Sequence, residues 1–370
     1  MYFLLISDRY LPMDNELSTK PTILQVLPAL EQGGVERGTL EIDNALVAAG
    51  WKSIVMSNGG RLVPQLKGKH LKLPLNSKNP AKILLNAHFL KAVIRANNVD
   101  IVHARSRAPA WSAYLAAKQT GTHFVTTFHG TYSIQNGAKR KYNSVMTKGE
   151  RVIAVSDFIR EHIIKNYKID PTKIVTIHRG ADVNKFNPDI APLGLGLPQG
   201  KKIVMLPGRI THWKGQHIFI EAMREIDALG VIVGDVENTN YMRELEKTLP
   251  DNIIILPGTP DLPPVLANAD VIVSASIRPE AFGRIAIEAQ AMGKPVVATN
   301  IGGALETVIN GKTGIYVAPN DAQAMRVAII KLLETGNNWK TACIENAANF
   351  STTKMCEKTL ALYNEIISAS

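Results

Sequence analysis

The sequence predicts an α/β protein made of two doubly wound, Rossmann-like domains that face each other across a cleft. Its 370 residues exceed what one hydrophobic core usually organises. Short apolar runs alternate with amphipathic segments of helical length along most of the chain. This alternation stops once, at the Pro/Gly-rich stretch 187–200, and then restarts. Two successive series of strands and helices indicate two parallel sheets, each covered by helices.

The first domain is predicted to span residues 1–188, and residues 189–200 to form a linker. Six apolar runs are expected to be its buried parallel strands: Thr22–Leu27, Ser53–Met56, Ile101–His103, Phe124–Phe128, Val152–Val155 and Lys173–His178.

The second domain is predicted to span residues 201–352. Its expected strands are Ile203–Leu206, Val231–Val233, Ile253–Leu256, Val271–Ser274, Pro295–Ala298 and Gly314–Val317. Helices are expected over Asp321–Glu334, Trp339–Asn349 and Thr353–Ile367, and the C-terminal helix, within 353–370, is expected to pack back on the first domain. Doubly wound sheets bind ligands at the carboxyl ends of their strands, so the site is expected in the cleft.

Composition indicates a globular enzyme of the cytoplasm. Hydrophobic residues make up 45% of the chain and charged residues 20%. The apolar run Tyr2–Ile6 is followed by Asp8 and Arg9 and is too short for a signal peptide or a membrane span. With no export signal, the two cysteines, Cys343 and Cys356, argue against both a disulfide framework and a zinc site.

The positive charge is concentrated in the first half of the chain. Residues 1–190 hold 26 Lys+Arg and 14 Asp+Glu, a net charge of +12, and the remainder holds 16 and 18, a net charge of −2. The basic half indicates contact with an anionic membrane surface or an anionic substrate, for example on the inner face of the cytoplasmic membrane. The alternative is that the lysines only keep the protein soluble. No nucleic-acid-binding motif accompanies the basic residues, so nucleic acid is not an expected partner.

Two loops after strands of the second domain suit phosphate and sugar. In the stretch 207–215, Arg209 and Lys214 stand in a glycine turn before a helix predicted over Gln216–Ile226. Cations and free amides at a helix start favour a diphosphate. In the stretch 278–288, Glu280 lies just before a helix expected to begin near Phe282, and Glu288 lies about two turns into that helix.

The two carboxylates of this second loop can accept hydrogen bonds from hydroxyls of a sugar and of a ribose. The amides of Phe282, Gly283 and Arg284 can hold a diphosphate at the start of the helix.

These motifs resemble the family-4 retaining glycosyltransferases of the GT-B fold. The resemblance rests on Gly208-Arg209-x4-Lys214-Gly215, Glu280-x7-Glu288, the glycine loop Gly33-Gly34-Val-Glu36 and the helix start Gly302-Gly-Ala-Leu-Glu306, and it covers nearly everything from Pro21 to Tyr363. Within the family, Thr127–Thr131, Ser106–Trp111 and His178–Asp182 are most similar to transferases that build the bacterial lipopolysaccharide core.

The resemblance implies a nucleotide-diphosphate sugar as donor and a glycan or glycolipid as acceptor, with no cofactor. It implies that Arg209 and Lys214 neutralise the diphosphate and that Glu280 and Glu288 bind the donor sugar and the ribose, respectively. It implies that His129 reaches the transferred sugar, that the backbone at Gly33 and Gly34 approaches the phosphates, and that the backbone near Leu256 contacts the nucleotide base. Arg179 departs from the family pattern, in which many relatives have Asn before the glycine.

Metal and ATP sites are not expected. Gly33–Gly38 has the glycine spacing of a phosphate loop but continues with Thr39 where the defining lysine would stand. Asp235 and Glu237 imitate a metal-binding acidic pair, but the Arg/Lys clamp makes a metal redundant, so a structural loop is favoured. Two rival functions stay open: a nucleotide-sugar epimerase, and a non-catalytic subunit that binds a nucleotide sugar.

Overall fold

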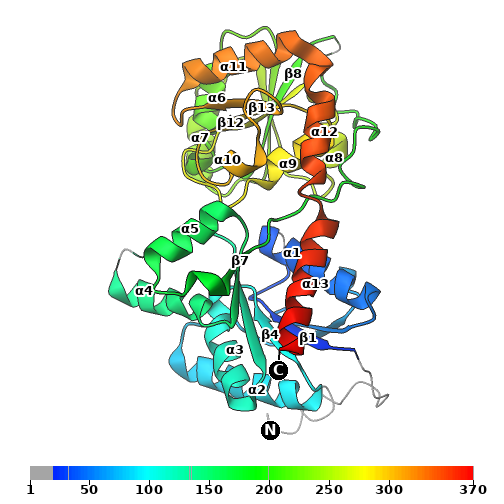
Figure 1. The fold of residues 1–370 in the computed structure, drawn as a ribbon. Coiled ribbons are helices and arrows are strands. Elements are labelled where there is room, and N and C mark those ends of the chain that lie inside the picture. The colour runs from blue at the N-terminus through cyan, green and yellow to red at the C-terminus, as the bar shows by residue number, and fades with distance from the viewer. Residues whose placement is uncertain (1–19, 32, 133, 135, 199, 370) are drawn as a thin grey trace. The chain divides into compact units, whose positions relative to one another are not determined.

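The computed structural model describes residues 20–369 except 32, 133, 135 and 199 (Figure 1). It divides into two compact units. The first consists of the residues up to Ile177 together with those from Cys356 onward, and the second of His178–Met355. The run Tyr2–Ile6 lies outside the described residues. Within those residues, no helix is both long enough and apolar enough to cross a bilayer.

The first unit contains a parallel sheet of seven strands in the order β3-β2-β1-β4-β5-β6-β7. This is the doubly wound order, with its topological switch between β1 and β4. The strands are β1 (Thr22–Val26), β2 (Lys52–Ser57), β3 (Lys69–Lys72), β4 (Ile101–Ala104), β5 (His123–Phe128), β6 (Arg151–Ala154) and β7 (Ile174–Thr176).

Helices follow the strands of this sheet. They are α1 (Gly34–Ala48), α2 (Pro80–Ala96), α3 (Arg107–Thr120), α4 (Gly137–Asn143) and α5 (Asp157–Asn166), with short 3-10 turns at η1 (Val63–Gln65), η2 (Ser144–Thr147) and η3 (Pro171–Lys173). Local sequence sets their limits. Asn79 caps α2 by accepting from Ala81 N and Lys82 N, and Pro80 occupies the first helical position, where its missing N–H costs nothing.

The last helix, α13 (Thr352–Ser368), contributes its part from Cys356 onward to the first unit. Tyr363 is fully buried there, and its hydroxyl lies 2.5 Å from His103 Nδ1. The other ring nitrogen of His103 lies 2.7 Å from Thr127 Oγ1. Burial, reinforced by nearby Arg105, holds the pKa of His103 well below its usual value, so the ring is neutral and its two nitrogens differ as donor and acceptor.

Replacing Tyr363 with phenylalanine is expected to lower the free energy of unfolding by about 1–3 kcal/mol. The change keeps the ring but leaves His103 Nδ1 buried without its hydroxyl partner. Urea-induced unfolding measures the loss. The matched control is Glu365→Gln on the same helix, which breaks an exposed ion pair with Arg151 and should cost under about 1 kcal/mol. Equal losses in the two variants would contradict this account.

The second unit contains a parallel sheet of six strands in the order β10-β9-β8-β11-β12-β13. The strands are β8 (Ile203–Pro207), β9 (Leu229–Val233), β10 (Ile253–Leu256), β11 (Val271–Ser274), β12 (Val296–Thr299) and β13 (Gly314–Val317). The sequence prediction of two doubly wound α/β domains is confirmed.

Both faces of this sheet are buried, which explains why its strands are apolar almost throughout. Alternate strand residues belong to different core clusters: Val204 and Leu206 to one, Ile203 and Met205 to the other. Helices α6 (Gln216–Met223), α7 (Thr239–Glu246) and α11 (Ala322–Thr335) complete the first cluster, and α8 (Pro263–Leu266) and α9 (Arg284–Ala291) the second (Figure 1). The unit also contains α10 (Ala304–Thr307) and α12 (Lys340–Ala348), with 3-10 turns at η4 (His212–Lys214) and η5 (Gly336–Trp339).

Two details differ from the sequence prediction. Lys69 and Lys72 belong to the short edge strand β3, which its polar sequence does not reveal. The boundary between the units falls at Ile177 and His178, and the stretch predicted as a linker belongs to the second unit. Leu193 explains this placement, because its amide donates to Pro264 O at 2.8 Å and thereby ties the stretch to α8.

Candidate functional site

The loop after β8 is fixed by close backbone contacts. Gly215 closes it in the left-handed conformation (φ 74°), and a Cβ there would lie 2.0 Å from Ala275 O, just after β11. A Cβ on Gly234, which follows β9, would lie 1.9 Å from Gly208 O. Only glycine fits either position without a backbone shift. The loop that carries Arg209 and Lys214 is therefore held at the carboxyl edge of the sheet, where α/β folds bind ligands.

Lys214 and Glu280 form an ion pair at this edge. Lys214 Nζ lies 2.7 Å from Glu280 Oε1, and the two side chains are only 15% and 17% exposed. Ser276 Oγ donates to the same Oε1 at 2.5 Å, and the Lys214 ammonium lies 4.7 Å from the centre of the Trp213 ring. Both contacts of the carboxylate fall on Oε1. Both residues were predicted from the sequence to belong to the site, but their ion pair was not predicted.

The ion pair decides the charge state of Glu280. Burial on its own would raise the pKa of this carboxyl, but Lys214, with help from the Ser276 hydrogen bond, holds it below its ordinary value. The carboxylate is therefore ionised at neutral pH and acts as a hydrogen-bond acceptor.

Arg209 lies in a more open environment. Its Nη1 is 3.1 Å from Glu237 Oε2, with the side chains 60% and 47% exposed. The segment that holds Glu237 runs beside the Arg209 loop, since Ile210 N donates to Asp235 O at 2.9 Å. An exposed pair of this kind contributes about 0–1 kcal/mol, so Arg209 can exchange this partner for an anionic ligand at little cost.

The backbone around Glu280 joins two loops. Glu280 bridges to Gly302, and Gly303 N donates to Glu280 O at 2.9 Å. A Cβ on Gly303 would lie 2.4 Å from Phe282 Cα. These glycines bring the start of α10 directly against the segment before α9.

Helix α9 starts at Arg284, and Gly283 is its N-cap in the left-handed conformation (φ 82°). The expectation that it begins near Phe282 is therefore wrong by two residues, because the turn at Gly283 precedes the first helical residue. Phe282 is 3% exposed and packs its ring near Phe350, so it offers its backbone rather than its side chain.

Glu288 lies one turn along α9 from Arg284. Its Oε1 is 3.3 Å from Arg284 Nε, and the two side chains are 12% and 17% exposed. Leu256 ends the edge strand β10, which pairs with β9, and its carbonyl oxygen accepts from Gly234 N at 3.1 Å, which links the predicted base-binding segment to the loop after β9.

The first unit carries the remaining predicted residues at the carboxyl edge of its own sheet. Gly33 is the N-cap of α1, and a Cβ on Gly34 would meet nothing within 4 Å. His129 directly follows β5, which lies beside β4 and one strand away from β1. Both segments thus stand where a parallel sheet binds ligands.

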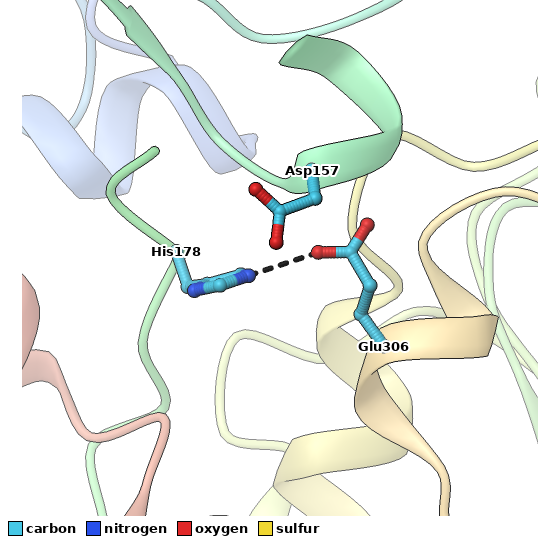
Figure 2. A group of neighbouring side chains, drawn as sticks. All are labelled: Asp157, His178 and Glu306. Carbon is cyan, nitrogen blue, oxygen red and sulfur yellow. Dashed lines mark hydrogen bonds and ion pairs between the residues drawn. The ribbon is translucent and has the colours of Figure 1, made fainter. Parts of the chain in front are cut away.

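One contact of the second unit was not anticipated from the sequence. His178 Nε2 lies 2.9 Å from Glu306 Oε2 on α10, with side chains 26% and 18% exposed (Figure 2). The His178 ring also packs 5.3 Å from the Phe350 ring. The two residues are 128 positions apart in the sequence, and no sequence pattern predicts a contact over such a distance.

The arrangement in the second unit suits a doubly charged leaving group. Lys214 and Arg209 place two cations on one loop, and the backbone amides at the start of α9 lie close to Glu280 in the chain. The carboxylate can accept hydrogen bonds from hydroxyls, and the ammonium and backbone amides can donate to phosphate oxygens.

Comparison with known proteins agrees with this chemistry. Two family models match, glycosyltransferase family 4 over residues 32–185 and glycosyl transferases group 1 over residues 192–350. The chain is 42% identical to a glycosyltransferase from Rickettsia africae ESF-5, with a TM-score of 0.88 and coverage of 95% of this chain and 100% of that one.

Two further relatives are more distant. A D-inositol 3-phosphate glycosyltransferase of Mycobacterium sp. (strain KMS) is 28% identical over 76% of this chain and 71% of its own length. The Anabaena protein HepE, solved in complex with UDP-glucose, is 21% identical with a TM-score of 0.79, and the match covers 94% of this chain and all of HepE. At that identity the likeness to HepE shows the fold alone.

Proposed function

Because this chain belongs to the family-4 glycosyltransferases of the GT-B fold, we propose that it transfers a sugar from a nucleotide-diphosphate sugar, with retention and without a metal ion. The proposed acceptor is a lipopolysaccharide-core or other glycolipid or glycan. The partly buried ion pair of Lys214 and Glu280 is the observation that carries this proposal, because it fixes a cation and a hydroxyl acceptor at the carboxyl edge of the sheet.

In the proposed mechanism, breaking the bond between the anomeric carbon and the diphosphate leaves negative charge on the leaving group. Lys214 and Arg209 would stabilise that charge as it develops. Glu280 Oε2 would accept a hydroxyl of the transferred sugar, and Glu288 would accept the ribose hydroxyls. A phosphate oxygen would take the acceptor proton, so that no separate base is required, and His129 would contact the transferred sugar.

The names of the relatives support the choice of ligands. UDP-glucose, which HepE binds, belongs to the class of donor proposed here, and the D-inositol 3-phosphate glycosyltransferase supports a phosphorylated acceptor. The Rickettsia and Mycobacterium relatives are both named glycosyltransferases, and we propose transfer rather than epimerisation.

The proposal is tested by incubating the protein with UDP-, GDP- and ADP-sugars and following nucleotide release with and without EDTA. Release from one donor, unchanged by EDTA and without an epimerised sugar, is expected. Loss of activity with EDTA would overturn metal independence and would indicate Asp235 as a candidate metal ligand. An epimerised sugar, or binding of the nucleotide sugar without turnover, would overturn the transferase assignment itself.

We further propose that the first unit docks on an anionic membrane. Helix α4 contains Lys139, Arg140 and Lys141 and no acidic residue. On α2, which also lacks acidic residues, Leu84 and Leu85 are 63% and 54% exposed. Basic residues near an anionic surface contribute about 1 kcal/mol each, and exposed leucines add apolar contact. This placement corresponds to the inner face of the cytoplasmic membrane.

Flotation with liposomes should show wild-type protein bound to anionic vesicles at low salt and released at high salt. The Lys139→Ala/Arg140→Ala/Lys141→Ala variant should bind at least tenfold more weakly, since about 3 kcal/mol is removed. A matched control, Lys165→Ala/Lys168→Ala/Lys173→Ala, removes the same charge elsewhere in the first unit. Wild-type protein that ignores anionic vesicles at low salt would make a soluble acceptor the better proposal.

A further inference from the structure

A second charged site lies in the second unit at the opposite edge of its sheet. A cavity of about 190 Å³ is formed where the strands begin, with Lys202 directly before β8, Asp270 directly before β11 and Lys294 close before β12. Lys340, the first residue of α12, also lines it.

This cavity is separate from the candidate donor site. The loop that carries Arg209 and Lys214 follows the last residue of β8, whereas the cavity lies before the first residue of that strand. The five residues of β8 rise ~3.3 Å each, so about 16 Å separates the two places. Helix α9 has its N-cap, Gly283, three residues after Glu280 and its C-cap, Met292, at the cavity, and the eight helical residues between them span about 12 Å.

The charges around the cavity do not balance. Three ammonium groups face one carboxylate, and that carboxylate is already engaged: Asp270 Oδ1 accepts from Lys202 Nζ at 3.0 Å, and Oδ2 accepts from Ile203 N at 2.8 Å. Lys294 Nζ donates to a neutral acceptor, Ala267 O, at 3.2 Å. Among the described residues, the salt bridges leave Lys294 and Lys340 without a carboxylate.

Burial and the neighbouring charges together lower the pKa of Lys294. Burial lowers the pKa of its ammonium, and although Asp270 opposes the effect, Lys340 and Lys202 reinforce it. A bound anion would remove the repulsion among these lysines and favour their charged forms.

The walls restrict what can enter. Gly293 (φ 72°) lets the stem of Lys340 pass, because a Cβ there would lie 2.7 Å from Lys340 Cγ. Leu332 and Met292 add apolar surface. Drug-sized ligands occupy pockets of roughly 300–1,000 Å³, so a cavity of about 190 Å³ is too small for an entire nucleotide sugar. Its size suits one phosphate group with a small substituent.

We propose that this cavity binds a small anion that carries one phosphate group, held by the ammonium groups of Lys294 and Lys340. Lysines act there as point charges, as they do in other phosphate sites. Two uncompensated cations match a dianion better than a single carboxylate.

Calorimetric titration with inorganic phosphate at low ionic strength tests the site. Because each of the two lysines would donate a charge-assisted hydrogen bond to the anion, Lys294→Met/Lys340→Met should weaken phosphate binding at least about tenfold. Lys294→Arg/Lys340→Arg keeps the charges and should retain binding. Lys185→Met/Lys247→Met removes two charges from the same unit without touching the cavity and should bind like the wild type.

Phosphate could also occupy the proposed donor clamp, and the titration is therefore repeated with Arg209→Ala/Lys214→Ala. This variant should keep the phosphate site. The inference is overturned if wild-type protein shows no saturable phosphate binding. It is also overturned if Lys294→Met/Lys340→Met, confirmed as folded by thermal unfolding, binds within twofold of wild type, or if binding disappears in the clamp variant instead.

Discussion

Replacing Lys214 with alanine is expected to lower turnover at saturating donor by roughly two orders of magnitude or more. The ammonium is held within 2.7 Å of Glu280 and is only 15% exposed, so its charge acts in a partly desolvated site where electrostatic stabilisation is strong. Loss of one such contact to a leaving diphosphate removes about 3 kcal/mol of transition-state stabilisation.

The measurement is steady-state turnover together with thermal unfolding, because Lys214→Ala also leaves the Glu280 carboxylate without its ion-pair partner. Lys247→Ala, an exposed lysine at the end of α7, is the control and should keep its turnover. Arg209→Ala should also lose turnover, but with little change in stability, because its pair with Glu237 is exposed. A folded Lys214→Ala protein with wild-type turnover would rule out the clamp.

The fold was predictable because the strands are buried on both faces. Runs such as Val271–Ser274 and Ile203–Leu206 lie on the observed strands β11 and β8, since a strand covered on both faces is apolar along nearly its whole length. The short polar strand β3 was not predicted. The edge strand β3 pairs only with β2, and three of the four residues of Lys69–Lys72 are polar, so the strand carries no apolar run.

The site was predictable only as separate motifs. The glycine loop and the two glutamates could be named because phosphate and sugar binding restrict residue type at fixed spacing along the chain. The pairing of Lys214 with Glu280 depends on a turn at Gly215 that packs on Ala275, and this close approach leaves no periodic trace in the sequence. The lysine cavity was not foreseen for the same reason, since its charged residues precede three different strands and begin one helix.

The two glutamates are expected to differ in what they lose. Glu280 lies beside Lys214 and Ser276, and its proposed contact to the transferred sugar strengthens as the glycosidic bond breaks. Glu288 lies on α9 beside Arg284, and its proposed contact to the ribose is the same in the ground state and the transition state. Interactions made only in the transition state raise turnover, whereas uniform interactions only tighten binding.

Glu280→Gln should therefore lower turnover by roughly tenfold or more at saturating donor. Its affinity for the free nucleotide should stay nearly unchanged, because the lost contact is made to the sugar and not to the nucleotide. Glu288→Gln should weaken nucleotide binding by about tenfold, a loss of about 1.4 kcal/mol, with a smaller change in turnover. Calorimetry with the free nucleotide and steady-state kinetics separate the two effects. Because glutamine keeps the size of glutamate, each variant changes mainly the charge. Equal losses of nucleotide affinity in both variants would contradict the assigned roles, and so would a Glu280→Gln protein that turns over donor as fast as wild type.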